Sequence, residues 1–103
     1  MHYLLIYDTA PDYLTRRGEF RQQHLALAWT FAERGELLLG GATGDPADGA
    51  MLLFQGDSPA AAEAFAAADP YVHNGLISKW TIKPWHTVVG EQASNPIRAV
   101  ATG

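Results

Sequence analysis

The sequence predicts a small α+β domain of the ferredoxin-like kind, with the element order β-α-β-β-α-β, an antiparallel sheet and both helices on one face. Short apolar runs bounded by Asp, Gly or Pro alternate with longer segments of helical pattern, which divides the chain into two strand-helix-strand halves. A right-handed crossover in each half places both helices on the same face of the sheet. The 103 residues, 48% of them hydrophobic and 17% charged, suffice for one packed core and no second domain.

The first strand and the first helix are predicted from apolar spacing. Residues 3–7 form an apolar, aromatic-rich run that ends before Asp8, which predicts a strand. Residues 15–34 predict a long amphipathic helix, because apolar side chains recur at helical spacing and Gly35 follows in a C-terminal cap position. The apolar positions of this helix are Phe20, Leu27, Ala28 and Phe31.

The second and third strands are short runs between glycines. Residues 37–39 are apolar and are followed by Gly40-Gly41, which predicts a second strand that ends there. Residues 50–54 lie between two further glycines and predict the third strand. The intervening stretch, 44–49, is rich in Gly, Asp and Pro and predicts a loop.

The second helix is predicted to start at Ser58-Pro59. The serine oxygen can cap free N–H groups, and proline suits the first helical position. The alanine-rich segment that follows ends before Asp69, which can itself cap one further turn over 70–74. Residues 77–85 alternate apolar with polar side chains, as in a half-exposed fourth strand.

The composition of the chain argues against several partners. The net charge is −4 and the seven basic residues are scattered, whereas nucleic-acid binding needs clustered Lys and Arg. No apolar run approaches the roughly 20 residues that span a bilayer, and no charged-then-apolar leader is recognisable. The chain has no cysteine and therefore no disulfide or thiolate chemistry. We expect a cytoplasmic protein without nucleic-acid or membrane partners.

The motifs of the sequence predict no cofactor and no metal. No glycine-rich loop follows a strand and opens a helix, as nucleotide cofactors require, and no Gly-x-Ser-x-Gly nucleophile motif is present. His73 follows Asp69 at a spacing that can hold a metal on a helix, but a third ligand is not apparent. Catalysis would then depend on His, carboxylate and hydroxyl groups.

The face of the sheet away from the helices needs a cover. The first three strands are apolar on both sides, and the two long helices cover one face. A second copy of the chain is the simplest cover, because closed homodimers are the commonest oligomers. Trp29, opposite Phe20 on the first helix, marks either a further contact surface or a partly exposed aromatic.

Several motifs resemble the YCII-related family over residues 1 to about 86. They are the run Arg21-Gln22-Gln23-His24-Leu25-Ala26, the Gly40-Gly41 step, Ala68-Asp69-Pro70-Tyr71 with Gly75 behind it, and Ile82-Lys83-Pro84-Trp85. The resemblance implies a dimeric α+β barrel with a paired histidine and aspartate in a pocket. It also implies that some relatives carry out cofactor-free elimination or isomerisation on small ring compounds. Two departures bear on pocket shape: Ala42-Thr43 replaces the usual Gly-Pro, and Gln23 replaces a small residue.

His24 and Asp69 are the predicted catalytic pair, although 45 positions separate them. The two helices are neighbours on one face of a ferredoxin-like sheet, so a residue of the first can face the exit of the second. A carboxylate that holds a neutral imidazole in one tautomer makes it a general base. The alternative is a hydrogen-bonded core histidine and an aspartate that only caps the following turn.

Arg17, Arg21, Gly41 and Tyr71 are the predicted substrate-binding residues. The arginines lie one turn apart on the His24 side of the helix and can bind a carboxylate or phenolate, although a solvated helix face would carry them equally well. Tyr71 can close the pocket with its ring or serve only in packing. Gly41 belongs to the glycine step of the family.

Two functions follow from this site. The first is a small cofactor-free enzyme that uses His24 and Asp69 for proton transfer on an aromatic or carboxylated small molecule. The second is a binding or accessory module that holds such a metabolite without converting it. The domain is predicted over residues 1–89, and residues 90–103 are a tail that contributes little to the core or packs on the partner subunit.

Overall fold

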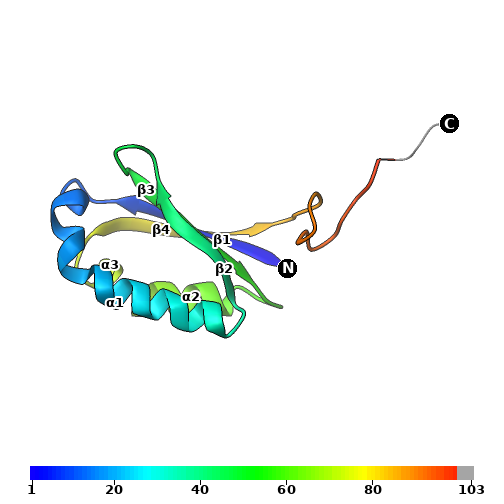
Figure 1. The fold of residues 1–103 in the computed structure, drawn as a ribbon, viewed down its shortest axis with the longest axis horizontal. Helices are drawn as coiled ribbons and strands as arrows, with labels where there is room; N and C mark the ends of the chain where they lie inside the picture. Colours follow the sequence, from blue (N-terminus) through cyan, green and yellow to red (C-terminus); the bar gives the residue numbers. More distant parts are fainter. Residues whose placement is uncertain (100–103) are drawn as a thin grey trace.

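The computed structural model describes residues 1–99 and contains a four-stranded antiparallel sheet with its helices on one face (Figure 1). The strand order is β2-β3-β1-β4. This arrangement confirms the predicted ferredoxin-like fold. In chain order the elements are β1 (His2–Thr9), α1 (Tyr13–Glu33), β2 (Leu37–Thr43), β3 (Gly49–Gln55), α2 (Ala60–Ala68), α3 (Pro70–His73) and β4 (Ile77–Trp85).

Strand β2 is longer than predicted, and the prediction that it ends at Gly40-Gly41 is wrong. Both glycines pair with β3, opposite Leu52 and Met51, and the strand continues to Thr43. Strand pairing uses backbone N–H and C=O groups, which glycine retains. A Cβ at Gly40 would lie 3.3 Å from the Cγ of Leu52, so the absence of a side chain there allows close packing on the core side of the sheet.

Helix α2 begins one residue later than the Ser-Pro motif predicts. The Pro59 carbonyl accepts the first helical hydrogen bond, from the Glu63 N–H at 3.0 Å, which makes Pro59 the N-cap and Ala60 the first helical residue. The Ser58 hydroxyl still accepts a hydrogen bond from the Ala60 N–H at 3.3 Å. The serine therefore supports the start of the helix from the position before the cap.

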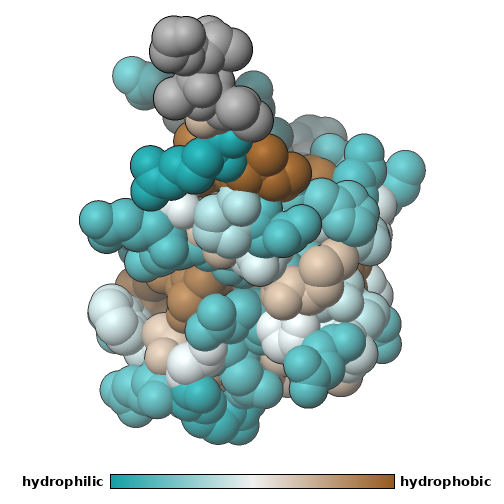
Figure 2. All heavy atoms as spheres, turned by 90° about the vertical axis from the view of Figure 1, so that its right-hand side faces the viewer, coloured by the Kyte–Doolittle hydropathy of each residue, from teal (hydrophilic) through white to brown (hydrophobic). Residues whose placement is uncertain are grey.

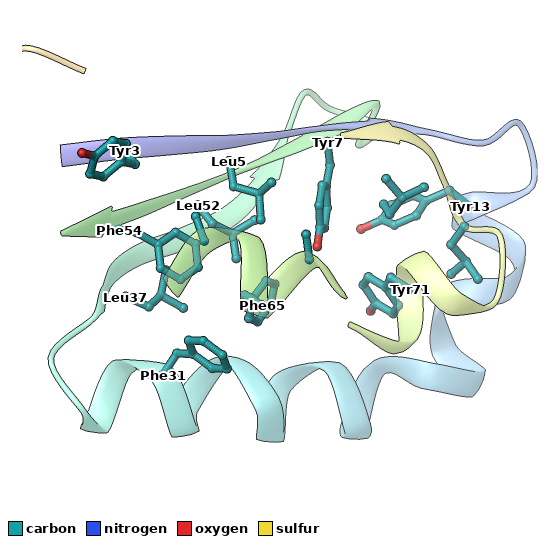
Figure 3. Close-up of a cluster of buried hydrophobic side chains, with 14 residues drawn as sticks. Tyr3, Leu5, Tyr7, Tyr13, Phe31, Leu37, Leu52, Phe54, Phe65 and Tyr71 are labelled. Atoms are coloured by element: carbon teal, nitrogen blue, oxygen red, sulfur yellow. The ribbon is translucent and has the colours of Figure 1, made fainter. Parts of the chain in front are cut away.

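The hydrophobic core lies between the sheet and the helix layer (Figure 3). Leu5 and Tyr7 of β1 point toward the helices, as do Leu52 and Phe54 of β3. Phe65 of α2 has no exposed surface. Its ring meets those of Phe31 and Phe54 with centroids 5.4 and 5.7 Å apart, distances typical of stabilising aromatic pairs. This packing fixes α1 and α2 against the sheet.

The other face of the sheet carries an apolar centre, as the sequence predicts. Side chains alternate along a strand, so Leu4 and Ile6 of β1 share this face with their partners Leu53 and Met51 of β3. Strand β4 is polar here, because Lys83 and Thr81 are paired with Leu4 and Ile6. Among residues 1–99, no helix is long and apolar enough to cross a membrane.

Residues 86–99 lead away from the body of the domain (Figure 1). Thr87 is tied to the first strand, since its hydroxyl lies 2.6 Å from the His2 ring nitrogen Nδ1. Beyond it the chain bonds mainly to itself, with the Ile97 N–H donating to the Val88 carbonyl at 2.8 Å. Val89 and Ile97 are 84% and 64% exposed. Figure 2, seen from the end that carries this segment, shows apolar surface beside it.

A chain that ends at Val89 should therefore fold as the full chain does. It keeps the Thr87–His2 contact, and the hydrogen bonds that it loses from residues 90–99 all lie within the segment 87–97. We expect a change in the free energy of unfolding of less than about 1 kcal/mol, the range of surface changes. Urea unfolding followed by circular dichroism measures it. Loss of a cooperative transition would mean that residues 90–103 support the core.

Candidate functional site

The carboxylate of Asp69 is the polar centre of the structure. Asp69 lies between α2 and α3, has no exposed surface and caps α3, because its Oδ1 accepts a hydrogen bond from the Tyr71 N–H at 3.0 Å. The Tyr7 hydroxyl donates to Oδ2 at 2.6 Å. The Nδ1 atom of His24 lies 2.8 Å from Oδ1. Burying a carboxylate is costly unless its oxygens are hydrogen-bonded, and these three donors meet that need.

His24 projects from α1 with its side chain 16% exposed. Its ring stacks on that of Tyr71, with centroids 3.9 Å apart and planes 8° from parallel, and meets the Phe65 ring edge-on. The predicted juxtaposition with Asp69 is therefore present. The two interpretations of Asp69 are compatible, because the same carboxylate caps α3 and holds the imidazole.

The Asp69 contact selects one tautomer of His24. An ionised carboxylate can only accept hydrogen bonds, so Nδ1 must carry the hydrogen that lies between the two groups. A neutral imidazole with a protonated Nδ1 has its lone pair on Nε2. This is the form in which histidine acts as a general base.

Tyr7 is the site residue that sequence reasoning missed. The sequence predicts that Tyr7 lies in a strand, but only the register of that strand shows that its side chain faces the helices beside Leu5 (Figure 3). A buried tyrosine hydroxyl needs a hydrogen-bond partner, and this rule was the available signal. Burial raises the pKa of the Tyr7 hydroxyl, and the charge of Asp69 and the hydrogen bond to it raise it further. Tyr7 therefore stays a donor to Asp69.

A groove of about 420 Å³ runs beside this pair, between α1 and the β2 side of the sheet. Every predicted site residue except Asp69 lines it. Gly41 contributes backbone alone, and a Cβ built there meets no atom within 4 Å. Asp69 lies behind His24, beneath the wall of the groove. The polar lining residues are Tyr7, Tyr13, Arg17, Arg21, His24 and Tyr71.

Arg17 and Arg21 bring positive charge to the groove. Within residues 1–99, neither has a carboxylate within ion-pair distance, whereas Arg16 and Arg34 are paired with Asp12 and Glu36. The Arg17 guanidinium lies 5.6 Å from the centroid of the Tyr13 ring. Burial and then Tyr13 raise the pKa of the Tyr71 hydroxyl, while both arginines oppose the shift. Their potential therefore reaches the ring that stacks on His24.

The region around Asp69 offers few ligands for a metal. Both carboxylate oxygens already accept hydrogen bonds from protein donors, and His73 instead contacts the carbonyl oxygen of Ala67. In the part of the chain that is described, no group of three or more His, Asp and Glu side chains is placed to hold an ion. An imidazole such as that of His24 can accept a proton, and arginines such as Arg17 and Arg21 can bind an anion.

Residues 1–86 match the YCII-related domain. The chain belongs to the YCII-related family. It is 31% identical over 97 residues to protein YciI of Escherichia coli O6:H1 and of Shigella flexneri, a match that spans 85% of this chain and 99% of each relative. An uncharacterized protein of Haemophilus influenzae is 29% identical over the same length. The family prediction is thereby confirmed.

The fold of this YCII-related chain is also found in a solved enzyme structure. The 5-chloro-2-hydroxyhydroquinone dehydrochlorinase TftG of Burkholderia phenoliruptrix AC1100, in complex with 2,5-dihydroxybenzoquinone, superimposes with a TM-score of 0.70. The match covers 84% of this chain and 95% of TftG, with 22% of residues identical. At that identity the likeness concerns the fold.

Tyr7→Phe should lower the free energy of unfolding at neutral pH. It should also make that free energy fall less steeply at alkaline pH. The substitution leaves Asp69 Oδ2 without its donor, which costs about 1–3 kcal/mol. The folded-state pKa of Tyr7 is raised above its ordinary 10.0. The stabilisation by the Tyr7 hydroxyl is therefore complete below pH 10.0 and is lost as the pH rises further.

Urea unfolding of the wild type and Tyr7→Phe at neutral and strongly alkaline pH measures both effects. Lysine deprotonation affects the two proteins alike, so their difference isolates Tyr7. An equally steep alkaline loss in the variant would show that the Tyr7 hydroxyl ionises normally in the folded protein.

Proposed function

We propose that this YCII-related chain is a small cofactor-free enzyme that moves a proton on a small ring compound, with elimination or isomerisation as its reaction. The observation that carries the proposal is the 2.8 Å contact between His24 Nδ1 and the fully buried Asp69 carboxylate. The pair lies at the wall of a groove that also holds two arginines without an ion-pair partner among residues 1–99. A histidine held in this way has the tautomer and the charge partner of a general base.

In the proposed mechanism, His24 Nε2 removes a proton from a carbon or hydroxyl group of the substrate. Asp69 stabilises the imidazolium that forms, while Tyr7 and the Tyr71 N–H hold the carboxylate in place. Arg17 and Arg21 stabilise the negative charge that develops on the ring oxygens.

Two outcomes are possible for the electron pair that the proton leaves behind. In isomerisation the double bond shifts, and the imidazolium returns the proton to another atom of the substrate. In elimination the pair forms a new double bond and a leaving group departs with its own bonding electrons. The imidazolium then releases its proton to the leaving group or to solvent. Both reactions balance without an oxidant or a second substrate.

The dehydrochlorinase that shares the fold supports the elimination branch. By its name TftG removes hydrogen chloride from a chlorinated hydroxyhydroquinone, and its complex contains a dihydroxybenzoquinone. A hydroxylated ring of this kind ionises to a phenolate, which suits the two arginines beside His24. We therefore propose hydroxylated or carboxylated rings as the substrates of this chain as well.

His24→Ala should abolish turnover in a screen of hydroxylated and halogenated ring acids. Loss of a general base lowers kcat/KM by about 10²–10⁴-fold. Asp69→Asn should also lower kcat/KM, because an amide neither carries the charge nor enforces the tautomer, while it can still cap α3. His86→Ala is the matched control, since His86 is exposed and lies outside the groove.

The same assay separates the enzyme from a binding module. Turnover that survives in His24→Ala would exclude His24 as the base. Binding of a ring acid without any conversion by the wild type would favour the module that the sequence left open.

We also propose that the chain forms a homodimer through the open faces of its two sheets. The support is the apolar centre on that face, where Met51 and Leu39 are 40% and 70% exposed. Exposed apolar surface of this kind is usually covered by a partner, and a twofold dimer covers both copies at once. A cytoplasmic location is part of the proposal, and the absence of cysteine is compatible with it.

Sedimentation velocity tests the dimer directly. The wild type should sediment as a dimer at micromolar concentration and Met51→Glu as a monomer, because a carboxylate would be buried without a partner at the centre of the interface. Ala64→Glu adds the same charge on the exposed side of α2 and should leave the dimer intact. A monomeric wild type would contradict the proposal.

A further inference from the structure

We propose that the ligand of this groove has an anionic head, bound by Arg17 and Arg21 beside His24, and an apolar extension that lies along α1 as far as Trp29. The inference rests on the proposed function for the reacting end of the ligand. It adds a substrate class: ring acids that carry an alkyl or aryl substituent.

The groove has two chemically different ends along α1. Its lining residues on the helix recur at intervals of three or four positions and form one stripe. The first part of the stripe holds Arg17, Arg21 and His24. The second part holds only apolar side chains, which are Leu25, Ala28, Trp29 and Ala32. From Arg21 to Ala32 the helix rises about 16 Å, more than the length of a single ring.

The opposite wall shows the same division. Strand β2 returns past α1 after a short turn, so its first residues lie near the end of the helix. Leu37 and Leu38 line the groove there, whereas the side chain of Leu39, which is paired with Leu53, lies on the open face of the sheet. Gly40 and Gly41 follow toward the polar end. Leu37 and Leu38 thus lie along the apolar half of the helix stripe, while Gly40, on the helix-facing side with Leu52, leaves space toward the polar end.

The size of the groove exceeds the needs of one ring. Benzene fills a protein cavity of about 150 Å³, whereas this groove holds about 420 Å³. Trp29 at its apolar end is 64% exposed, and an apolar substituent would cover it. The head is an anion by charge complementarity, because the polar end of the groove holds two arginines that have no acidic partner within residues 1–99.

Calorimetric titration with 4-alkylbenzoates of increasing chain length tests the proposal, with the corresponding 4-alkylbenzyl alcohols as neutral probes. The dissociation constant of the acids should fall about two- to fourfold for each added methylene, the gain expected from burying a CH₂ group. The alcohols should bind at least tenfold more weakly, and Arg21→Gln should remove most of that difference.

Trp29→Ala should flatten the dependence on chain length and leave unsubstituted benzoate unaffected. Trp80→Ala is the matched control, because Trp80 is a partly exposed tryptophan of β4 that does not line the groove. Ala28→Phe has the opposite effect on space, because it fills the apolar half of the groove. It should exclude the longer acids and not the shorter ones. Affinity that does not change with chain length in the wild type would overturn the inference.

These outcomes separate the inference from the proposed function. His24→Ala should keep the dependence on chain length, because the substituent lies away from the imidazole. A steep dependence in a protein without any turnover would refute the proposed enzyme and leave the inference standing. Turnover of unsubstituted ring acids, together with an affinity that does not depend on chain length, would refute the inference and leave the proposed enzyme standing.

Discussion

The buried carboxylate of Asp69 is the constraint on which the structure around the site depends. A carboxylate without solvent contact must receive hydrogen bonds from the protein, and here they come from three separate elements. Tyr7 reaches it from β1, the Tyr71 N–H from α3 and His24 from α1. Satisfying one buried charge therefore joins the sheet to both parts of the helix layer.

The same constraint gives the site its chemistry. An imidazole that only filled the core would be free to adopt either tautomer, whereas the Asp69 contact requires hydrogen on Nδ1 and leaves Nε2 with its lone pair. Stacking on Tyr71 fixes the plane of the ring. The groove then adds positive charge at one end and apolar surface at the other. A general base, an anion site and room for a substituent thus lie along one helix.

Much of this arrangement was predictable from local patterns. Alternation and helical spacing predicted the elements and their order. The ferredoxin-like topology allows His24 and Asp69 to meet, and the resemblance to the YCII-related family selected these two residues. What depends on register escaped prediction: the inward position of Tyr7, the continuation of β2 through Gly40-Gly41, and the apolar half of the groove. Each requires knowing which side chains face one another across elements distant in sequence, and periodicity does not carry that information.

The ring nitrogens of His24 provide the most direct test of the account. Nitrogen-15 NMR of the full chain at alkaline pH distinguishes the two neutral tautomers of the imidazole. If Asp69 holds the imidazole as described, Nδ1 carries the hydrogen in the wild type, and Asp69→Asn loses this strict preference. A wild-type ring with its hydrogen on Nε2 would contradict it, because Nδ1 could then not donate to Asp69 and the base would lack its lone pair toward the substrate.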